Sequence, residues 1–103
     1  VPEADVVITN PTHVAVALQY DAETMRAPVV VAKGYGKVAG KIKALAEDHR
    51  VPVFRNPPVA RALYEHGELD EAIPIAYYEA VAKIIGYVYK MRGKTPPARQ
   101  RAS

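Results

Sequence analysis

Hydrophobic positions form short runs in the first part of the chain and helical stripes in the second. The pattern predicts four strands, at residues 5–9, 13–20, 29–32 and 51–54. The first run, DVVIT, is rich in β-branched residues, which is typical of a strand buried on both sides. The second, HVAVALQY, alternates apolar positions between its two faces. Between them lies an Asn-Pro-Thr turn signal.

In three further stretches, apolar residues recur at helical spacing. One helix of about three turns follows the third strand, and its expected buried positions are Val38, Ile42, Leu45 and Ala46. A second opens with Asn56 as its N-cap and proline in its first turn, and ends near Gly67. The last begins at Pro74. Its apolar stripe is expected to contain Ile75, Tyr78, Val81, Ala82, Ile85, Val88 and Tyr89.

These elements predict an α/β fold in a single domain, with a central mixed sheet of about four strands flanked by three or four helices. The chain has 103 residues, enough for one core and too few for two. The domain is expected to span residues 1–92. Residues 93–103 (GKTPPARQRAS) have no apolar anchor and are expected to form a basic flexible tail.

Composition narrows the class of protein. Half of the residues are apolar, 24% are charged and none is cysteine, which excludes disulfides and thiolate chemistry. The start, VPEADVV, is not a signal peptide, and no uncharged apolar window is long enough to span a membrane. The net charge is +3, but residues 1–89 hold 9 basic and 11 acidic groups, so the excess is in the tail. A nucleic-acid partner is therefore not expected.

The sequence lacks the residue sets of several common metal, catalytic and nucleotide-binding sites. His13, His49 and His66 have no second ligand at metal spacing, so no metal or other cofactor is expected. Ser103 is the single serine, which excludes a serine-hydrolase triad. The run 34–40 (GYGKVAG) is one residue too long for a dinucleotide fingerprint, and is interpreted as a strand-to-helix turn.

The Asn10-Pro11 bond has a specific chemistry available to it. The nitrogen of Pro11 bears no hydrogen, so it cannot attack the Asn10 side chain as in ordinary deamidation. The Asn10 amide nitrogen can instead attack its own main-chain carbonyl carbon, close a succinimide and expel the nitrogen of Pro11. Pre-positioning of such a group is worth an effective molarity of about 10⁵ M, or roughly 7 kcal/mol of barrier.

Neighbouring groups supply the remaining requirements. Backbone N–H groups of the turn are expected to stabilise the oxyanion, and His13 or a water to protonate the leaving nitrogen. Thr12 is expected to shape the turn. Asn56-Pro57 is an internal comparison: as a helix N-cap, Asn56 holds its carboxamide away from its own carbonyl, so that bond is expected to stay intact. An Asn-Pro pair is, on the other hand, most often only a turn.

Four segments together carry a family resemblance. They are ADVVITNPTHVAVALQYD, APVVVAKG, VPVFRNPPVARALY and IP..YYEAVAKIIGYVY. Over residues 2–92 they resemble the cytoplasmic domain of the bacterial type III export switch proteins, the FlhB, YscU and SpaS family, and most closely its flagellar members. Because a four-helix membrane domain precedes this region in the family, and the chain lacks an initiator Met, an excised cytoplasmic portion is expected.

The resemblance implies a function. It implies self-cleavage between Asn10 and Pro11 with the two pieces remaining associated, linked to a change from early rod and hook-type to late filament-type export substrates. By position, Ala27, Pro28, Ala82 and Ile85 resemble an apolar crevice that receives early substrates. Implied partners are other export-gate components and the hook-length control protein, at the cytoplasmic face of the inner membrane. Such a protein acts once on itself and is not a multiple-turnover enzyme.

Two alternatives stay open from the residues alone. One is an interaction module in which the turn is never cut and function lies in apolar grooves. The other is an RNA-binding α/β domain, suggested by the small size and the pI of 9.2 but opposed by the charge distribution.

Overall fold

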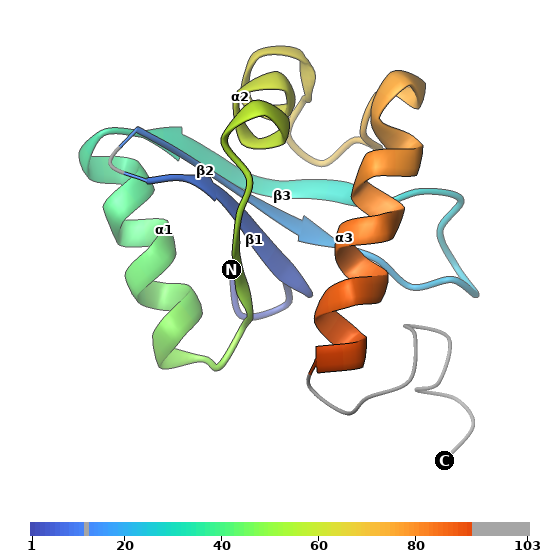
Figure 1. Ribbon diagram of the computed structural model, residues 1–103, viewed down its shortest axis with the longest axis horizontal. Helices are drawn as coiled ribbons and strands as arrows, with labels where there is room; N and C mark the ends of the chain where they lie inside the picture. Colours follow the sequence, from blue (N-terminus) through green and yellow to red (C-terminus); the bar gives the residue numbers. More distant parts are fainter. Residues whose placement is uncertain (12, 92–103) are drawn as a thin grey trace.

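The computed structural model describes residues 1–11 and 13–91, so Thr12 and the expected tail, residues 93–103, lie outside the described residues. Within them, four strands form one sheet and three α-helices pack on it (Figure 1). The elements are β1 (Val6–Asn10), β2 (Val14–Gln19), β3 (Val29–Tyr35), α1 (Lys37–Asp48), β4 (Val53–Arg55), α2 (Pro57–His66), a 3-10 turn (Ile75–Tyr77) and α3 (Tyr78–Met91). The predicted fold class is confirmed.

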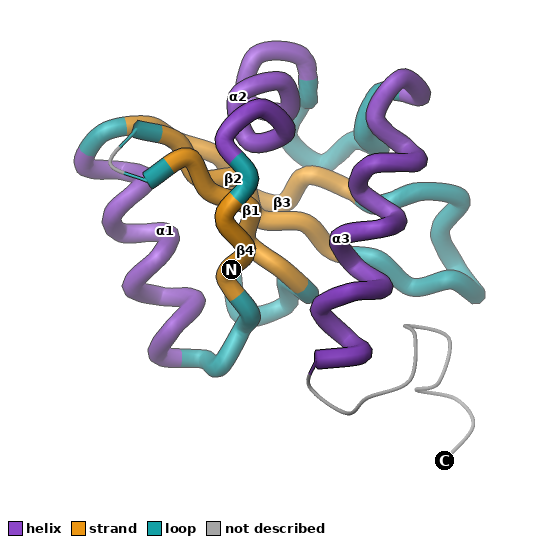
Figure 2. The backbone as a smooth tube through the Cα atoms, viewed as in Figure 1, coloured by secondary structure: helices purple, strands orange, loops and turns teal. Residues whose placement is uncertain are grey.

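The sheet is mixed, and β1 lies inside it. The strand order is β3-β2-β1-β4, with β1 antiparallel to β2 and parallel to β4. Figure 2 shows the strands in orange, between α1 and α3. β2 is also antiparallel to β3. The β-branched composition of β1 suits this position, since its side chains are covered on both faces of the sheet.

Two apolar layers cover the sheet. Alternation along β1 sends Val6 and Ile8 into a core shared with α2 and α3, while Val7 enters a second core against α1. Figure 1 shows α1 on one side of the strands and α3 on the other. None of the helices in the described part of the chain is both long and apolar enough to cross a bilayer.

β1 and β2 begin and end within one residue of the predicted bounds, whereas β3 and β4 differ more. β3 was expected to stop at Ala32 but continues to Tyr35, because β2 supplies partners as far as Val14, which is opposite Tyr35. Gly34 therefore lies inside the strand rather than ending it. β4 spans Val53–Arg55 rather than residues 51–54, since Pro52 cannot donate to the ladder.

The buried face of α1 also differs from the prediction. Ala39, Ile42 and Ala46 are buried, whereas Val38 and Leu45 are 52% and 43% exposed. The sheet presents Ala15 and Ala17 to this helix. Small side chains on both sides let the helix lie close to the sheet, which leaves its larger residues at the margins.

The last helix is rotated slightly from the predicted stripe. Ile75 belongs to the 3-10 turn and is 77% exposed, and Ala82 is also exposed. Ile84, which was not in the predicted stripe, is buried. The short turn after Pro74 shifts the start of regular helix to Tyr78, and the core face then repeats from Val81.

Candidate functional site

Asn10 is the last residue of β1, and the Asn10-Pro11 peptide opens the turn of the β1–β2 hairpin. Asn10 is opposite Val14 in the register. The main-chain N–H of His13 donates to the Asn10 carbonyl oxygen at 2.9 Å. That oxygen is the one that becomes negatively charged when its carbon is attacked, so this N–H already lies where an oxyanion donor is required.

Hydrogen bonds to neighbouring elements hold both sides of the turn. The N–H of Asn56 donates to the Thr9 carbonyl at 2.9 Å, and the N–H of Gly36 donates to the His13 carbonyl at 2.8 Å. Pro11 and His13 are exposed while Asn10 is half-buried. The turn is thus fixed by the sheet on one side and by the start of α1 on the other, while Pro11 and His13 are open to water.

A small cleft of about 100 Å³ adjoins the bond. Asn10, Pro11, Gly36, Gly40 and Lys43 are among the residues that line it. Gly36 has φ of 63°, in the left-handed region that glycine adopts readily, and this lets the chain turn from β3 into α1 beside the cleft. The GYGKVAG run does connect a strand to a helix, as predicted, but the turn itself is at Gly36, since Gly34 and Tyr35 belong to β3 and Lys37 begins α1.

The two Asn-Pro pairs differ in their surroundings. Asn56 Oδ1 accepts from the N–H of Val59 at 3.2 Å, and Pro57 begins α2, as predicted for an N-cap. The Asn10 carboxamide, by contrast, has no hydrogen-bond partner among the residues that the structure describes. One carboxamide is therefore held by a helix end, and the other is not restrained in that way.

The four residues assigned to an apolar crevice line one hollow. This crevice has a volume of about 290 Å³ and is lined by Tyr20, Arg26, Ala27, Pro28, Tyr78, Ala82, Ile85 and Gly86. Its lining residues come from α3 and from the segment that joins β2 to β3.

Sequence reasoning missed half of the crevice lining. Gly86 could have been found, because it is four residues after Ala82 on the same helix. Tyr78 could have been found in the same way, because it precedes Ala82 by four residues and belongs to the predicted stripe. Tyr20 and Arg26 come from the segment between β2 and β3, whose approach to α3 depends on tertiary packing, and no local signal indicated them.

Lys33, on β3, has a structural role. Lys33 Nζ donates to the carbonyls of Tyr64 and Gly67 at 2.9 and 2.7 Å, so it satisfies the C-terminal end of α2. In the described ranges, no group of three or more potential ligands is placed to hold a metal ion.

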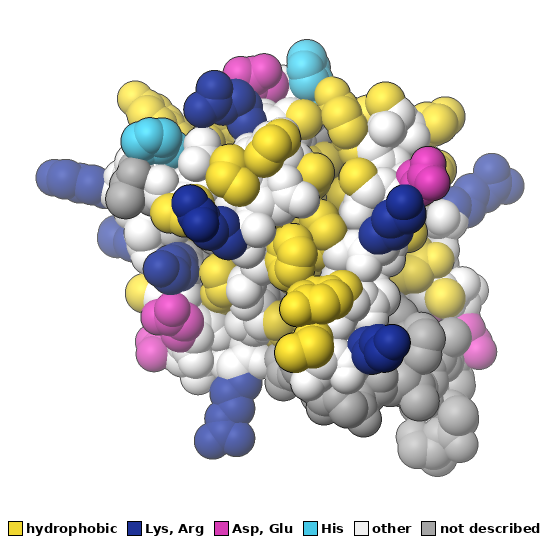
Figure 3. Space-filling view, in the orientation of Figure 1, with side chains coloured by type: hydrophobic (Ala, Val, Ile, Leu, Met, Phe, Trp, Pro, Cys, Tyr) yellow, Lys and Arg dark blue, Asp and Glu magenta, His cyan; other side chains and the backbone are white. Residues whose placement is uncertain are grey.

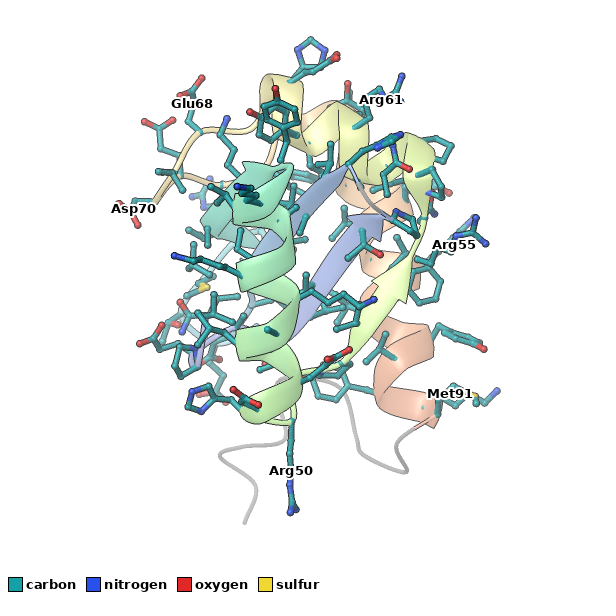
Figure 4. The ribbon with its side chains drawn as sticks, turned by 90° about the vertical axis from the view of Figure 1, so that its left-hand side faces the viewer. Arg50, Arg55, Arg61, Glu68, Asp70 and Met91 are labelled. Atoms are coloured by element: carbon teal, nitrogen blue, oxygen red, sulfur yellow. The ribbon has the colours of Figure 1, made fainter. Side chains whose placement is uncertain are left out.

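Basic side chains are spread over the surface. In Figure 4, Arg50, Arg55 and Arg61 project outward in different directions. On the face shown in Figure 3, dark-blue side chains stand apart from one another among apolar and neutral ones. This face carries no continuous basic patch.

Comparison with known proteins gives three consistent results. The model of the family described as "FlhB HrpN YscU SpaS Family" matches residues 1–88. The flagellar biosynthetic protein FlhB of Salmonella typhimurium is 48% identical over 103 residues, covering 94% of this chain and 27% of that protein. FlhB of Bacillus subtilis is 51% identical over 94 residues, with 91% and 26% covered. The chain thus spans about a quarter of these relatives.

Solved structures share the fold. The cytoplasmic domain of FlhB from Shewanella putrefaciens aligns with a TM-score of 0.84 at 42% identity, covering 88% of this chain and 70% of that chain. A mutated C-terminal domain of EscU aligns with a TM-score of 0.80 at 31% identity, with 84% and 86% covered.

Proposed function

Since this chain belongs to the family of FlhB, HrpN, YscU and SpaS, we propose that it is the cytoplasmic part of a flagellar export switch that cuts its own backbone between Asn10 and Pro11. The cut acts as a specificity switch in the bacterial flagellar type III export gate. It occurs once per molecule, so the chain is not a multiple-turnover enzyme.

The proposed reaction is asparagine cyclisation. The Asn10 side-chain nitrogen bonds to the Asn10 main-chain carbonyl carbon, and the peptide bond to Pro11 breaks. The attacking amide loses a proton, the Pro11 nitrogen gains one, and the products are a C-terminal succinimide and a new N-terminal proline. Water later opens the succinimide. The observation that carries the proposal is the His13 N–H, 2.9 Å from the carbonyl oxygen under attack.

The frame of the turn supports the proposal. The Thr9 and His13 carbonyls are both hydrogen-bonded to other elements. These bonds restrain the backbone on both sides of the Asn10-Pro11 bond, so Asn10 is held in one conformation for the attack. Proline disfavours the helical region for the residue before it, which suits the extended conformation of Asn10. His13 is exposed at the turn and is the proposed proton donor, directly or through water, to the leaving nitrogen.

A related protein supports the choice of bond. One EscU structure carries an asparagine-to-alanine substitution, and another carries proline-to-alanine at the next residue. In EscU, therefore, an adjacent Asn-Pro pair has been altered residue by residue.

Intact-mass analysis of the purified protein tests the proposal. The wild type is expected to separate under denaturing conditions into residues 1–10 and 11–103. Asn10→Ala removes the nucleophile and is expected to remain full length. Asn56→Ala, the matched control at the second Asn-Pro pair, is expected to be cut at Asn10 as the wild type is. If the wild type is recovered solely as the full-length species after prolonged incubation, the proposal is contradicted.

The crevice is the proposed site for export substrates. Ala27, Pro28, Ala82 and Ile85 line it, and an apolar hollow of this kind fits a short hydrophobic segment of an early rod or hook-type protein. Other gate components and the hook-length control protein are further proposed partners, at the cytoplasmic face of the inner membrane.

The crevice also favours a second candidate, an interaction module that is never cut. The mass experiment separates the two, because substrate binding without scission leaves one full-length species. The RNA-binding alternative gains no support from the dispersed arginines (Figure 4).

A further inference from the structure

Asp5, just before β1, joins two segments that are distant in sequence. Its Oδ2 accepts from the main-chain N–H of Tyr20 at 2.7 Å. Its Oδ1 accepts a short hydrogen bond from the hydroxyl of Tyr89 on α3. These two interactions are called the Asp5 bridge below. Hydrogen bonds to a carboxylate are stronger than those between neutral groups.

Both ends of the Asp5 bridge adjoin the crevice. Tyr20 lines it directly, and Tyr89 lies one helical turn beyond Ile85, which lines it from α3. Tyr89 is itself buried, with 6% of its surface exposed. The bridge therefore connects the two walls of the crevice, the helix and the segment that follows β2.

The other buried side chains of α3 are apolar. Val81, Ile84, Ile85 and Val88 pack into the core with the sheet residues. Hydrophobic packing is largely non-directional, so it resists sliding or rotation of a helix less than a charge-assisted hydrogen bond does. The Asp5 bridge is thus a directional restraint between the end of α3 and the sheet.

Asp5 belongs to residues 1–10, the segment that scission separates from the rest of the chain. We propose that Asp5 is a positioning residue through which this segment fixes α3 and thereby the shape of the crevice. After the cut, the crevice is then built from two polypeptides, and the short one controls it. The role in the cut protein rests on the proposed function, but the bridge itself is present in the intact chain.

Hydrogen exchange of the α3 amides tests this inference in the uncut chain. Asn10→Ala provides the background, so that every molecule is intact. Adding Tyr89→Phe removes one hydroxyl, and is expected to speed exchange of the amides of residues 81–89 by about tenfold. Tyr87→Phe is the matched control: its ring is on the same helix and 52% exposed, and exchange is expected to stay within about twofold.

Asp5→Ala gives a second, independent variant. It removes the acceptor of Tyr20 as well as that of Tyr89, so it is expected to speed exchange on α3 at least as much as Tyr89→Phe does. The double variant is expected to add little to Asp5→Ala, because the bond from the Tyr89 hydroxyl is already lost in it. Equal α3 exchange in Tyr89→Phe and Tyr87→Phe overturns the proposal. So does a fully additive double variant.

A second readout uses the self-cleaving chain. After scission, Tyr89→Phe is expected to release residues 1–10 at a lower urea concentration than Tyr87→Phe, measured by gel filtration and mass. Release at the same concentration contradicts the role of the bridge in the cut protein. Failure of scission itself gives a full-length mass in every variant, a result distinct from the exchange data.

Discussion

At the scale of single residues, Pro11 has two roles in the proposed reaction. Its nitrogen is the leaving group, and its ring biases Asn10 toward extended backbone. Pro11→Ala is therefore expected to slow scission at least about tenfold, because an ordinary amide leaves the conformation of Asn10 less restricted. The fraction cut over time, measured by intact mass, checks this. Scission at the wild-type rate would show that neither property matters.

Gly34 is a second residue whose identity is dictated locally. A Cβ atom there would overlap Val38 Cγ1 and lie 2.8 Å from Val38 Cβ, which is fixed to the helix backbone. Gly34→Ala is expected to lower the free energy of unfolding by about 1–3 kcal/mol, measured by urea denaturation.

Gly86 provides the comparison for that substitution. It lies inside α3, and a Cβ there meets nothing within 4 Å. Gly86→Ala is expected to raise the free energy of unfolding by up to about 1 kcal/mol, since alanine favours the helix. Equal effects of the two substitutions would mean that the close approach of Gly34 to Val38 is not rigid.

At the scale of elements, Ile84 and Ile75 test the phase of the last helix. Ile84 is 6% exposed and packs in the core with β1 and β2, whereas Ile75 is 77% exposed. Ile84→Ala is expected to lower the free energy of unfolding by about 2–4 kcal/mol and Ile75→Ala by less than about 0.5 kcal/mol, in urea denaturation. A larger loss for Ile75→Ala than for Ile84→Ala would instead support the buried face that was predicted from the sequence.

The type of each element followed from local patterns, but its packed face did not always follow. The β-branched run of β1 and the N-cap at Asn56 are local signals, and both predictions are confirmed. The buried face of α1 depends on the alanines that β2 presents to it. The spacing of apolar residues within α1 contains no information about those alanines, so it cannot predict which face of the helix packs on them.

The same limit applies to the candidate site. The Asn10-Pro11 turn could be predicted because its chemistry is local to a few consecutive residues. The hydrogen bond from Gly36 to His13 and the lining of the crevice by Tyr20 and Tyr78 join segments that are distant in sequence. They depend on the register of the sheet, which the sequence pattern does not specify.

At the scale of the whole molecule, stability depends on the inner strand. Val7 is on β1, between β2 and β4, and its side chain is fully buried in the core against α1. Val7→Asp places a carboxylate in this core at a cost of several kcal/mol, comparable with the entire stability of a small domain. The variant is expected to be unfolded at 25 °C by circular dichroism, whereas Val38→Asp, at an exposed position, is expected to be folded. A native-like melting curve for Val7→Asp would contradict the assignment of β1.

The inner position of β1 also makes the proposed cut irreversible. With β2 on one side and β4 on the other, the severed ten-residue piece has no open edge from which to peel, and exchanging it for a fresh copy requires melting the whole domain. Under the proposed function, a chain that has been cut therefore cannot return to the uncut state by exchange of residues 1–10, and a new chain must be synthesised.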